Sequence, residues 1–547
     1  MFRLLKQNKK FSVERIYLLF VTLSTLLPGF GAFENNPVRW MTLGAITILF
    51  ILYNNLIAKD KLKVNFEKSV IVILSGIYLI FNCLVADNFS ESIISLYKLV
   101  IIVSVFYTST IAIKKINNVF LFVCQIFTIS IFLESTYTLL DFISINESFT
   151  GISQNRNISS SSIVFKLVFL IYLINTSKLF STKLTLKILE IVALFSIILL
   201  QSRLGLISVF TIYLLYFIFM KPLRKNIYIS LIVSSLFFIY FQTNDFQNQV
   251  EKTYKLENLS DDTSTVQRLS FYKKSISLYN DKPLYGNGLG SWKYKSLENE
   301  ISDNNNILVP YYTHNDFLQI LMETGLIGLI IYLIFFFLLI RNILSFRTNK
   351  TFTPLILVLV LVTFNSMINF PIHRTQEYIP FIICCSFIFS KRDFNEKNKK
   401  SNLLTILLVL LIPSVLIANN EYRSLKVQEI LMNDYANNTF SLDIKEIEKI
   451  DYKLPNLSSN SVPVSTYLSR YYFNETLFNE SIKLLNYSLI ANKYDLMTQE
   501  LLLKNYIFTN QTNKAYDLIK NLLNKYPNNK NYSELFQAIS RELEIKD

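Results

Sequence analysis

The sequence predicts an all-α membrane protein with many spans, and composition, hydropathy and the placement of charge all favour this fold class. The chain has 547 residues, of which 51% are hydrophobic, and its mean hydropathy is +0.34. This excludes a soluble enzyme of ordinary composition. Lys and Arg outnumber Asp and Glu by 54 to 40. The basic residues fall in short segments between apolar runs, which is typical of membrane loops and not of a nucleic-acid-binding face.

Apolar runs of membrane-spanning length occur about thirteen times along the chain. They lie at 16–33, 38–57, 69–86, 94–113, 119–141, 161–177, 185–201, 204–220, 226–242, 317–340, 352–370, 376–390 and 402–418. They divide the chain into four parts. These are nine spans within 1–242, a large polar loop at 243–316, four spans within 317–418, and a polar tail at 419–547.

The distribution of basic residues predicts which side of the membrane each loop faces. Arg3, Lys6, Lys9 and Lys10 precede the first run, and no small-residue cleavage site follows it, so we expect a retained anchor and a cytoplasmic N-terminus. Lys and Arg then cluster in every second loop, as the positive-inside rule requires. The loop 243–316 and the tail 419–547 are therefore predicted to be periplasmic, with the spans in a bacterial inner membrane.

The tail contains a repeated segment. Ser481-Ile482-Lys483-Leu484-Leu485 recurs 34 residues later as Ala515-Tyr516-Asp517-Leu518-Ile519, and Pro527 closes the second unit. This period predicts tetratricopeptide-like helical hairpins, with an ordinary helical domain as the alternative. Such a tail would serve as a platform for a protein partner. The four cysteines lie inside apolar runs, so neither a disulfide framework nor a zinc site is encoded.

Three basic side chains stand near the predicted outer ends of spans. Arg203 lies between two closely spaced runs, Arg268 lies in the large loop, and His314 directly precedes a long apolar run. Arg203 is either a snorkelling side chain or a functional one. Asn315 or Thr313 can cap the helix that follows, whose N-terminus favours phosphate oxygens. Because histidine is well suited to accept a proton near neutral pH, His314 is a candidate general base, with a structural cap as the alternative.

A glycine-rich turn precedes that histidine. Gly286, Gly288 and Gly290 follow Pro283, but no strand comes before them and no Gly-Lys-Ser/Thr comes after, so a nucleotide site is excluded. The glycines either supply positive φ angles in a tight turn or expose N–H groups to an anion. Tyr311, Tyr312 and Trp292 are candidates for stacking on sugar rings or for ordinary interfacial packing.

These residues together resemble the O-antigen ligase and polymerase superfamily. The segment His314-Asn315-Asp316-Phe317-Leu318, followed by Glu323, Gly325 and Gly328, is similar to its His-Asn-x-x-Leu…Glu-x-Gly-x-x-Gly motif. Ser202-Arg203-Leu204-Gly205 and Arg268 with the 283–290 turn resemble two further motifs, although Leu204, Lys282 and Asn287 depart from them. Asn155, Asn157 and Pro371-Ile372-His373-Arg374 are weaker matches, and the resemblance covers roughly 150–390.

The resemblance implies an enzyme that transfers a glycan from an undecaprenyl-pyrophosphate carrier to an acceptor hydroxyl, such as lipid A core, without metal or other cofactor. It implies that Arg203 and Arg268 bind the pyrophosphate and that His314 is catalytic. It further implies supporting roles for Asn315, Glu323, Gly286, Gly288 and Arg374. We expect these groups to converge on one outward-facing cavity, since leaving group and acceptor meet at one reacting centre.

Three acceptors remain open within this class: lipid A core sugar, another carrier-linked glycan, or a Ser/Thr of an exported protein, as in ligases, polymerases and O-oligosaccharyltransferases. A polysaccharide transporter is a further alternative, although its polar groups would lie nearer the membrane midplane. The roles of Lys98, Lys166, Glu134 and Glu190 inside spans are open between assisting the carrier and pairing with one another.

Overall fold

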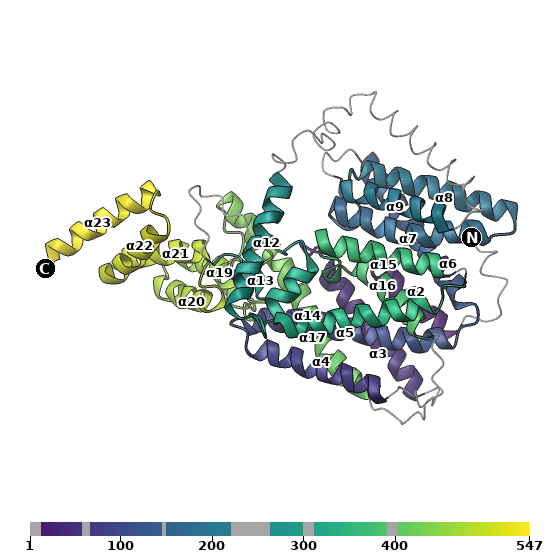
Figure 1. Ribbon diagram of the computed structural model, residues 1–547. Helices are drawn as coiled ribbons and strands as arrows, with labels where there is room; N and C mark the ends of the chain where they lie inside the picture. The colour runs from purple at the N-terminus through teal and green to yellow at the C-terminus, as the bar shows by residue number, and fades with distance from the viewer. Residues whose placement is uncertain are drawn as a thin grey trace.

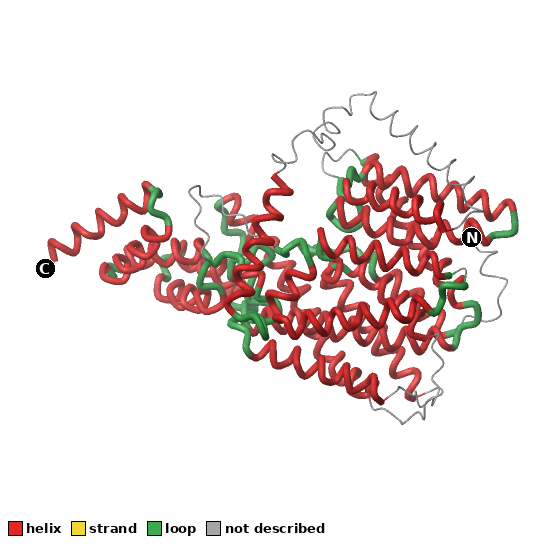
Figure 2. The backbone as a smooth tube through the Cα atoms, viewed as in Figure 1, coloured by secondary structure: helices red, strands yellow, loops and turns green. Residues whose placement is uncertain are grey.

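The computed structural model describes residues 12–56, 66–144, 149–219, 263–298, 311–349, 351–390 and 403–546. Within these residues the chain forms helices joined by turns and loops, with no strand, as the sequence predicts (Figures 1 and 2). The predicted span 226–242 and much of the large loop lie outside the described residues.

The helices up to the large loop are α2 (Val13–Ser24), α3 (Asn36–Leu56), α4 (Phe66–Leu84), α5 (Phe89–Lys114), α6 (Val119–Ile143), α7 (Arg156–Thr176), α8 (Phe180–Leu199) and α9 (Arg203–Phe219). The loop and the next spans form α12 (Thr263–Asp281), α13 (Trp292–Lys295), α14 (Asp316–Leu344), α15 (Phe352–Ile368), η3 (Pro371–His373) and α16 (Thr375–Ser390). The last part forms α17 (Leu403–Asn437), α18 (Ile444–Ile447), α19 (Val464–Asn474), α20 (Phe478–Ala491), α21 (Leu496–Phe508), α22 (Thr512–Lys525) and α23 (Lys530–Lys546).

Among the described residues, six helices are long and apolar enough to cross a membrane by length and composition: α3, α5, α6, α7, α14 and α17. Apolar segments of α4, α9, α15 and α16 are shorter. The predicted total of thirteen is not confirmed. The first predicted span, 16–33, is helical only as far as Ser24, because Pro28 and Gly29 follow and disfavour a longer helix.

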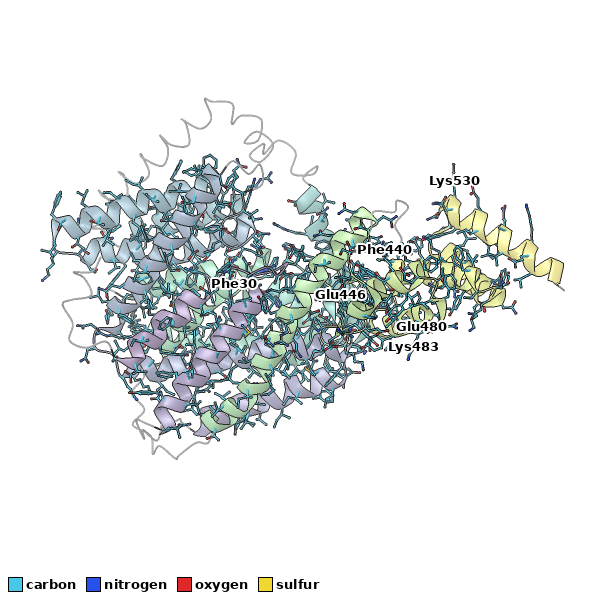
Figure 3. All side chains as sticks on the ribbon, turned by 180° about the vertical axis from the view of Figure 1, so that it is seen from behind. Phe30, Phe440, Glu446, Glu480, Lys483 and Lys530 are labelled. Atoms are coloured by element: carbon cyan, nitrogen blue, oxygen red, sulfur yellow. The ribbon has the colours of Figure 1, made fainter. Side chains whose placement is uncertain are left out.

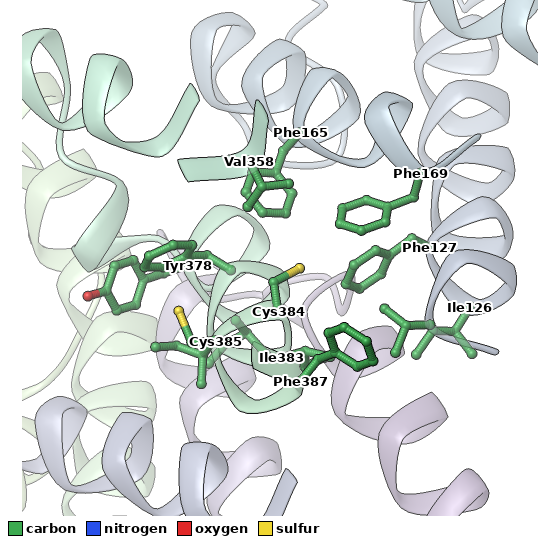
Figure 4. Close-up of a cluster of buried hydrophobic side chains, with 14 of the residues drawn as sticks. Ile126, Phe127, Phe165, Phe169, Val358, Tyr378, Ile383, Cys384, Cys385 and Phe387 are labelled. Atoms are coloured by element: carbon green, nitrogen blue, oxygen red, sulfur yellow. The ribbon is translucent and has the colours of Figure 1, made fainter. Parts of the chain in front are cut away.

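The core of the bundle is built around α7 and α16. Every side chain of α16 from Thr375 to Ile388 is buried, and 89% of the apolar window of α7 is buried inside the protein. Figure 4 shows Cys384 and Phe387 of α16 beside Phe127 of α6 and Phe169 of α7. The four cysteines are free and buried. They serve as apolar packing groups.

The charged side chains inside the bundle are paired. Lys166 of α7 forms an ion pair with Glu134 of α6, and Ser162 donates a hydrogen bond to the same carboxylate. Lys98 pairs with Glu421 at 3.2 Å, and Lys187 pairs with Glu190 at 2.7 Å. Pairing removes most of the cost of holding an isolated charge at membrane depth. The four groups whose roles the sequence leaves open therefore have partners within the protein.

Helix α14 is broken in its first third at Gly325, which adopts φ 64° and ψ −171°. A membrane interior has no water to satisfy the backbone groups that such a break releases. Residues 283–288 of the loop supply these partners. Leu326 N donates to Pro283 O at 2.9 Å, Ile327 N to Leu284 O at 3.3 Å, Asn287 N to Met322 O at 3.0 Å, and Gly288 N to Glu323 O at 2.8 Å. The hydrogen bonds at the break thus hold the large loop against a candidate spanning helix.

The tail is joined to the bundle at the end where the large loop lies. Helix α17 runs without interruption through the predicted boundary at 418/419. Helices α19–α23 project from the bundle on the side of α12 and α13 (Figure 1). Viewed from behind, Glu480, Lys483 and Lys530 lie on this projecting part, and Glu446 of α18 lies nearer the bundle (Figure 3). The tail is helical, as predicted, while its tetratricopeptide class stays a prediction.

Two contacts dock the tail on the rest of the protein. The amides of Asn88 and Asn456 exchange hydrogen bonds of 3.0 and 3.1 Å. Tyr294 of α13 packs in one buried cluster with Leu457 and Ala491 of the tail. The Tyr294 hydroxyl also accepts a hydrogen bond from the Asn88 backbone N–H at 3.2 Å. The start of α5, the loop and the tail therefore form one packed unit.

We expect Gly286→Ala to destabilise the protein strongly. Gly286 has φ +75°, and an added Cβ would lie 2.3 Å from the backbone oxygen of Glu323. Strained backbone and overlap together should cost at least about 2 kcal/mol. The midpoint of thermal unfolding in detergent measures the effect. Gly76→Ala is the control, because its Cβ would meet nothing within 4 Å and alanine favours a helix. Equal unfolding midpoints for the two variants would contradict the close packing of Gly286 against the Glu323 backbone.

Candidate active site

His314 occupies the turn that leads into α14. Its backbone is left-handed, with φ 56°, and the next residue, Asn315, caps the helix by accepting a hydrogen bond from Leu318 N at 3.0 Å. The imidazole lies edge-on to Phe370 at 4.9 Å and stacks near Phe271 at 6.3 Å. Its Nδ1 is buried and has no hydrogen-bond partner among the described residues. That nitrogen is therefore not committed to a hydrogen bond with the described part of the chain.

The surroundings of His314 keep its imidazole neutral. The pKa of His314 is lowered to about 4, mainly by burial and also by repulsion from Arg268 and Arg374, while a hydrogen bond with Asn369 acts in the opposite direction. A histidine with a lowered pKa is protonated only below that pKa. At neutral pH the ring is therefore an acceptor of protons and not a cation.

Two side chains hold the His314 turn against neighbouring elements. The Tyr272 hydroxyl donates to His314 O at 2.9 Å and also lies 3.2 Å from Met367 O. Asp316 Oδ2 accepts from the Ser366 hydroxyl at 3.0 Å and from Ile372 N at 3.3 Å. Tyr272 follows Arg268 by one helical turn on α12, so the same contact brings Arg268 to the histidine.

Arg374 lies on the other side of the aromatic groups. Its guanidinium is 5.0 Å from the Phe370 ring centroid and 5.5 Å from that of Tyr312, and it pairs with Glu34 at 3.8 Å. Its Nε is buried and has no hydrogen-bond partner within the described part of the chain. Arg374 is thus partly neutralised, whereas Arg268 has no carboxylate partner in the residues described.

Arg203 begins α9 at the same end of the bundle. Ser202, directly before it, donates a hydrogen bond to Asn157 at 3.0 Å, and Ile158 packs with Tyr312 and Phe370. The structure brings Arg268 and His314 together, and the convergence of Arg203 with them stays a prediction.

The glycine turn binds a carboxyl group that belongs to the chain itself. The Glu323 carboxylate accepts hydrogen bonds from Gly290 N at 3.0 Å and Trp292 N at 3.4 Å, and from the Gln319 side chain at 3.1 Å. Gly286, Gly288 and Gly290 have positive φ, as the tight-turn interpretation expects. Glu323, Gly286 and Gly288 therefore shape the loop, and their supporting role in the site stays a prediction.

The aromatic residues proposed for sugar stacking are largely covered. Trp292 is 1% exposed and packs with Phe271, Leu278 and Met322. Tyr312 is buried between Phe370 at 4.4 Å and His373 at 4.5 Å. Tyr311 is half-buried, with Lys293 5.5 Å from its ring centroid. These contacts are the ordinary packing that the sequence left as the alternative, so only Tyr311 keeps part of its surface exposed.

Tyr272, Asp316 and Asn369 are site residues to which the sequence analysis assigns no role. Tyr272 could have been found from its position one turn after Arg268, and Asp316 from its place as a carboxylate at the start of an apolar helix. Asn369 has no such signal, since its approach to His314 depends on how α15 ends. Among the described residues, no group of three or more His, Cys, Asp or Glu side chains is placed to hold a metal ion.

The fold and the site define a helical, multi-pass membrane protein with a histidine and arginines at one end of its bundle. Residues 188–333 match the family model described as O-antigen ligase, so the family resemblance seen in the motifs is confirmed over this segment. Arg203, Arg268 and His314 lie inside the matched segment, whereas Arg374 lies outside it.

A curated protein adds to this match. Over 139 residues the chain is 34% identical to a provisionally named polysaccharide ligase from Rickettsia conorii, strain Malish 7. The alignment covers 24% of this chain and 33% of that protein, so the chain matches about a third of its relative's length. Family model and relative together support a polysaccharide-ligase type of function.

Both histidines should stay neutral near pH 6. The chain has only two, so a histidine-labelled sample in detergent gives two imidazole signals whose ¹⁵N shifts report protonation. The pKa of His314 is lowered to about 4 and that of His373 to about 3. Arg268→Gln should raise the pKa of His314 by removing a repelling cation and leave that of His373 unchanged, since Lys98 and Arg374 act on the latter. An unchanged pKa of His314 in Arg268→Gln would show that His314 and Arg268 are not neighbours.

Proposed function

We propose that this protein is a membrane glycosyltransferase of the O-antigen ligase type. It transfers a glycan from an undecaprenyl-pyrophosphate carrier to an acceptor hydroxyl, of lipid A core or a similar sugar, on the periplasmic side. The observation that carries the proposal is the neutral His314, whose buried Nδ1 has no partner, next to the cationic Arg268. A base and a cation at one point are what transfer from a glycosyl diphosphate requires.

The reaction follows from this pair of groups. His314 Nδ1 accepts the proton of the acceptor hydroxyl as its oxygen attacks the anomeric carbon. The bond from that carbon to the phosphate oxygen breaks, and the diphosphate leaves with the electron pair. Arg268 and Arg203 stabilise the added charge on the leaving group through charge-assisted hydrogen bonds. The start of α14 adds the positive end of its helix dipole.

The side of the membrane follows from the charge pattern and the docking of the tail. Basic residues alternate along the loops so that the tail 419–547 faces the periplasm. The Asn88–Asn456 pair and the Tyr294 cluster join that tail to the loop carrying Arg268. Site and tail therefore share one compartment, which would be the one that holds the outward-facing lipid carrier.

A protein O-oligosaccharyltransferase is the second candidate, and the docked tail favours it. Helical repeats beside a transfer site would present a protein acceptor or an assembly partner to it. Comparing surface glycans after deletion of the gene separates the acceptors. Carrier-linked polymer that no longer reaches lipid indicates a ligase, single repeat units indicate a polymerase, and unglycosylated exported proteins indicate the protein transferase.

His314→Ala should reduce transfer to background while leaving donor binding nearly unchanged, because the imidazole removes a proton and does not hold the diphosphate. Arg268→Lys should lower the transfer rate at least about tenfold, since lysine keeps the charge but loses the planar fork. Transfer from purified lipid-linked donor and donor binding are measured on the same samples. His373→Ala is the control, because His373 is the other histidine of the chain and stacks on Tyr312, without a ring contact to His314 among the described residues. Near-normal transfer by His314→Ala would remove the catalytic assignment.

A reporter that is active only in the cytoplasm should be silent when fused after Asp547. The same reporter fused after Lys115, in a predicted inside loop, should be active and serves as the control. A bright fusion at Asp547 would move the tail, and the site docked against it, to the cytoplasmic side.

A further inference from the structure

Helix α12, which carries Arg268, has two apolar faces. One face packs on α14 through the buried side chains of Phe271, Ser275 and Leu278. The opposite face exposes Val266, Leu269 and Ile276, whose side chains are 50%, 53% and 48% exposed. Their spacing of three and seven residues places them in one stripe along the helix. An exposed apolar stripe of this kind on a helix marks a surface that contacts something other than water.

The position of α12 indicates what covers that stripe. The helix runs across the direction of the spanning helices at one end of the bundle (Figure 1). Ser275 donates to Leu318 O at 3.0 Å, and Phe271 packs with Met322. Both partners belong to the first two turns of α14, a candidate membrane span. The helix therefore lies beside the start of that candidate span and crosses the direction of the spanning helices.

Exposed apolar side chains also occur directly after α12 and on the two apolar helices that contact this segment. Leu284 and Tyr285 follow α12 and are 59% and 42% exposed. Their segment is hydrogen-bonded to α14 through Leu284 O and Ile327 N at 3.3 Å, and to α4 through Tyr285 O and Asn82 at 2.6 Å. The neighbouring outer side chains of those helices are also apolar and exposed. They include Ile77, Phe81 and Leu84 of α4 and Leu326, Ile327 and Ile330 of α14.

The charge of α12 matches a phosphate-bearing surface. Lys273, Lys274 and Lys282 accompany Arg268 over this stretch, and Asp281 is the acidic residue among positions 263–282. A basic helix with an apolar face typically lies in the interface plane of an anionic membrane. A protein partner would need neither this position nor the neighbouring exposed apolar side chains.

We propose that α12 is an interfacial helix whose Val266, Leu269 and Ile276 side chains lie among the acyl chains of the leaflet nearest the site, and that the lipid-linked donor reaches Arg268 along this helix. The route of the donor to Arg268 rests on the proposed function. Arg268 lies within one helical turn of Val266 and Leu269 but outside their stripe, toward the face that packs on α14. A diphosphate at headgroup depth would meet the guanidinium on that side while its isoprenoid chain stays in the leaflet. The donor would need no extraction from the membrane.

The lipid contact is tested without any activity. The four native cysteines are buried, so a thiol-reactive environment-sensitive dye attaches selectively to Leu269→Cys. In vesicles of phosphatidylethanolamine and phosphatidylglycerol its emission should shift to the blue and be quenched by nitroxide-labelled lipids. The control is Ile490→Cys in α20, where the native side chain is 77% exposed, and its dye should remain unquenched. Equal, unquenched emission at both positions would overturn the proposal, as would a blue shift at Leu269→Cys that appears only after a protein is added.

The donor route is tested by chain length. Replacing Val266, Leu269 and Ile276 together by serine should raise KM for the full-length undecaprenyl donor about tenfold. KM for a water-soluble donor with a short prenyl chain should stay unchanged. In the control variant Ile490→Ser, KM should stay unchanged for both donors. An equal rise in KM for the two donors, or no rise in KM for either, would overturn the donor route. If the unaltered protein transfers no glycan from either donor, the proposed function fails, and the dye measurement still decides the lipid contact.

Discussion

The break in α14 at Gly325 is the constraint on which the arrangement of the site depends. A spanning helix cannot leave backbone groups unpaired in hydrocarbon, so the freed groups are bonded to residues 283–288. This pairing sets where the large loop leaves the membrane. The Glu323 carboxylate then orients the glycine turn, and α12 lies along the outer turns of α14. Arg268 and His314, 46 positions apart by their residue numbers, become neighbours as a consequence.

Two effects that usually oppose each other act together on His314. Burial disfavours its charged form, and Arg268 and Arg374 disfavour it as well. The same cations would attract a diphosphate, whose negative charge offsets their repulsion of the histidine. Binding of an anionic donor would therefore raise the basicity of the imidazole at the moment when a proton has to be removed. Glu34 forms an ion pair with Arg374, so the contribution of Arg374 to this effect is reduced.

The sequence predicts the all-helical class well, because apolar runs and glycine positions are local properties. It also offers His314 and Arg268 as candidates, since a histidine at a helix start and a motif can be read without coordinates. It does not predict that α2 ends at Ser24 or that α17 continues into the tail. The Arg374–Glu34 pair, the approach of Asn369 to His314 and the burial of Trp292 depend on contacts between distant segments. No pattern along the chain records them.

The reciprocal amide contact between Asn88 and Asn456 has a consequence for biosynthesis. The two residues are 368 positions apart, so the ribosome has translated all of the spanning segments before the pair can form. Until then Tyr294 lacks Leu457 and Ala491 as packing partners, and the loop that carries the glycine turn is incompletely held. Each newly made molecule thus matures in two stages, insertion first and closure of the site second. A chain halted in between would be integrated in the membrane before its site is complete.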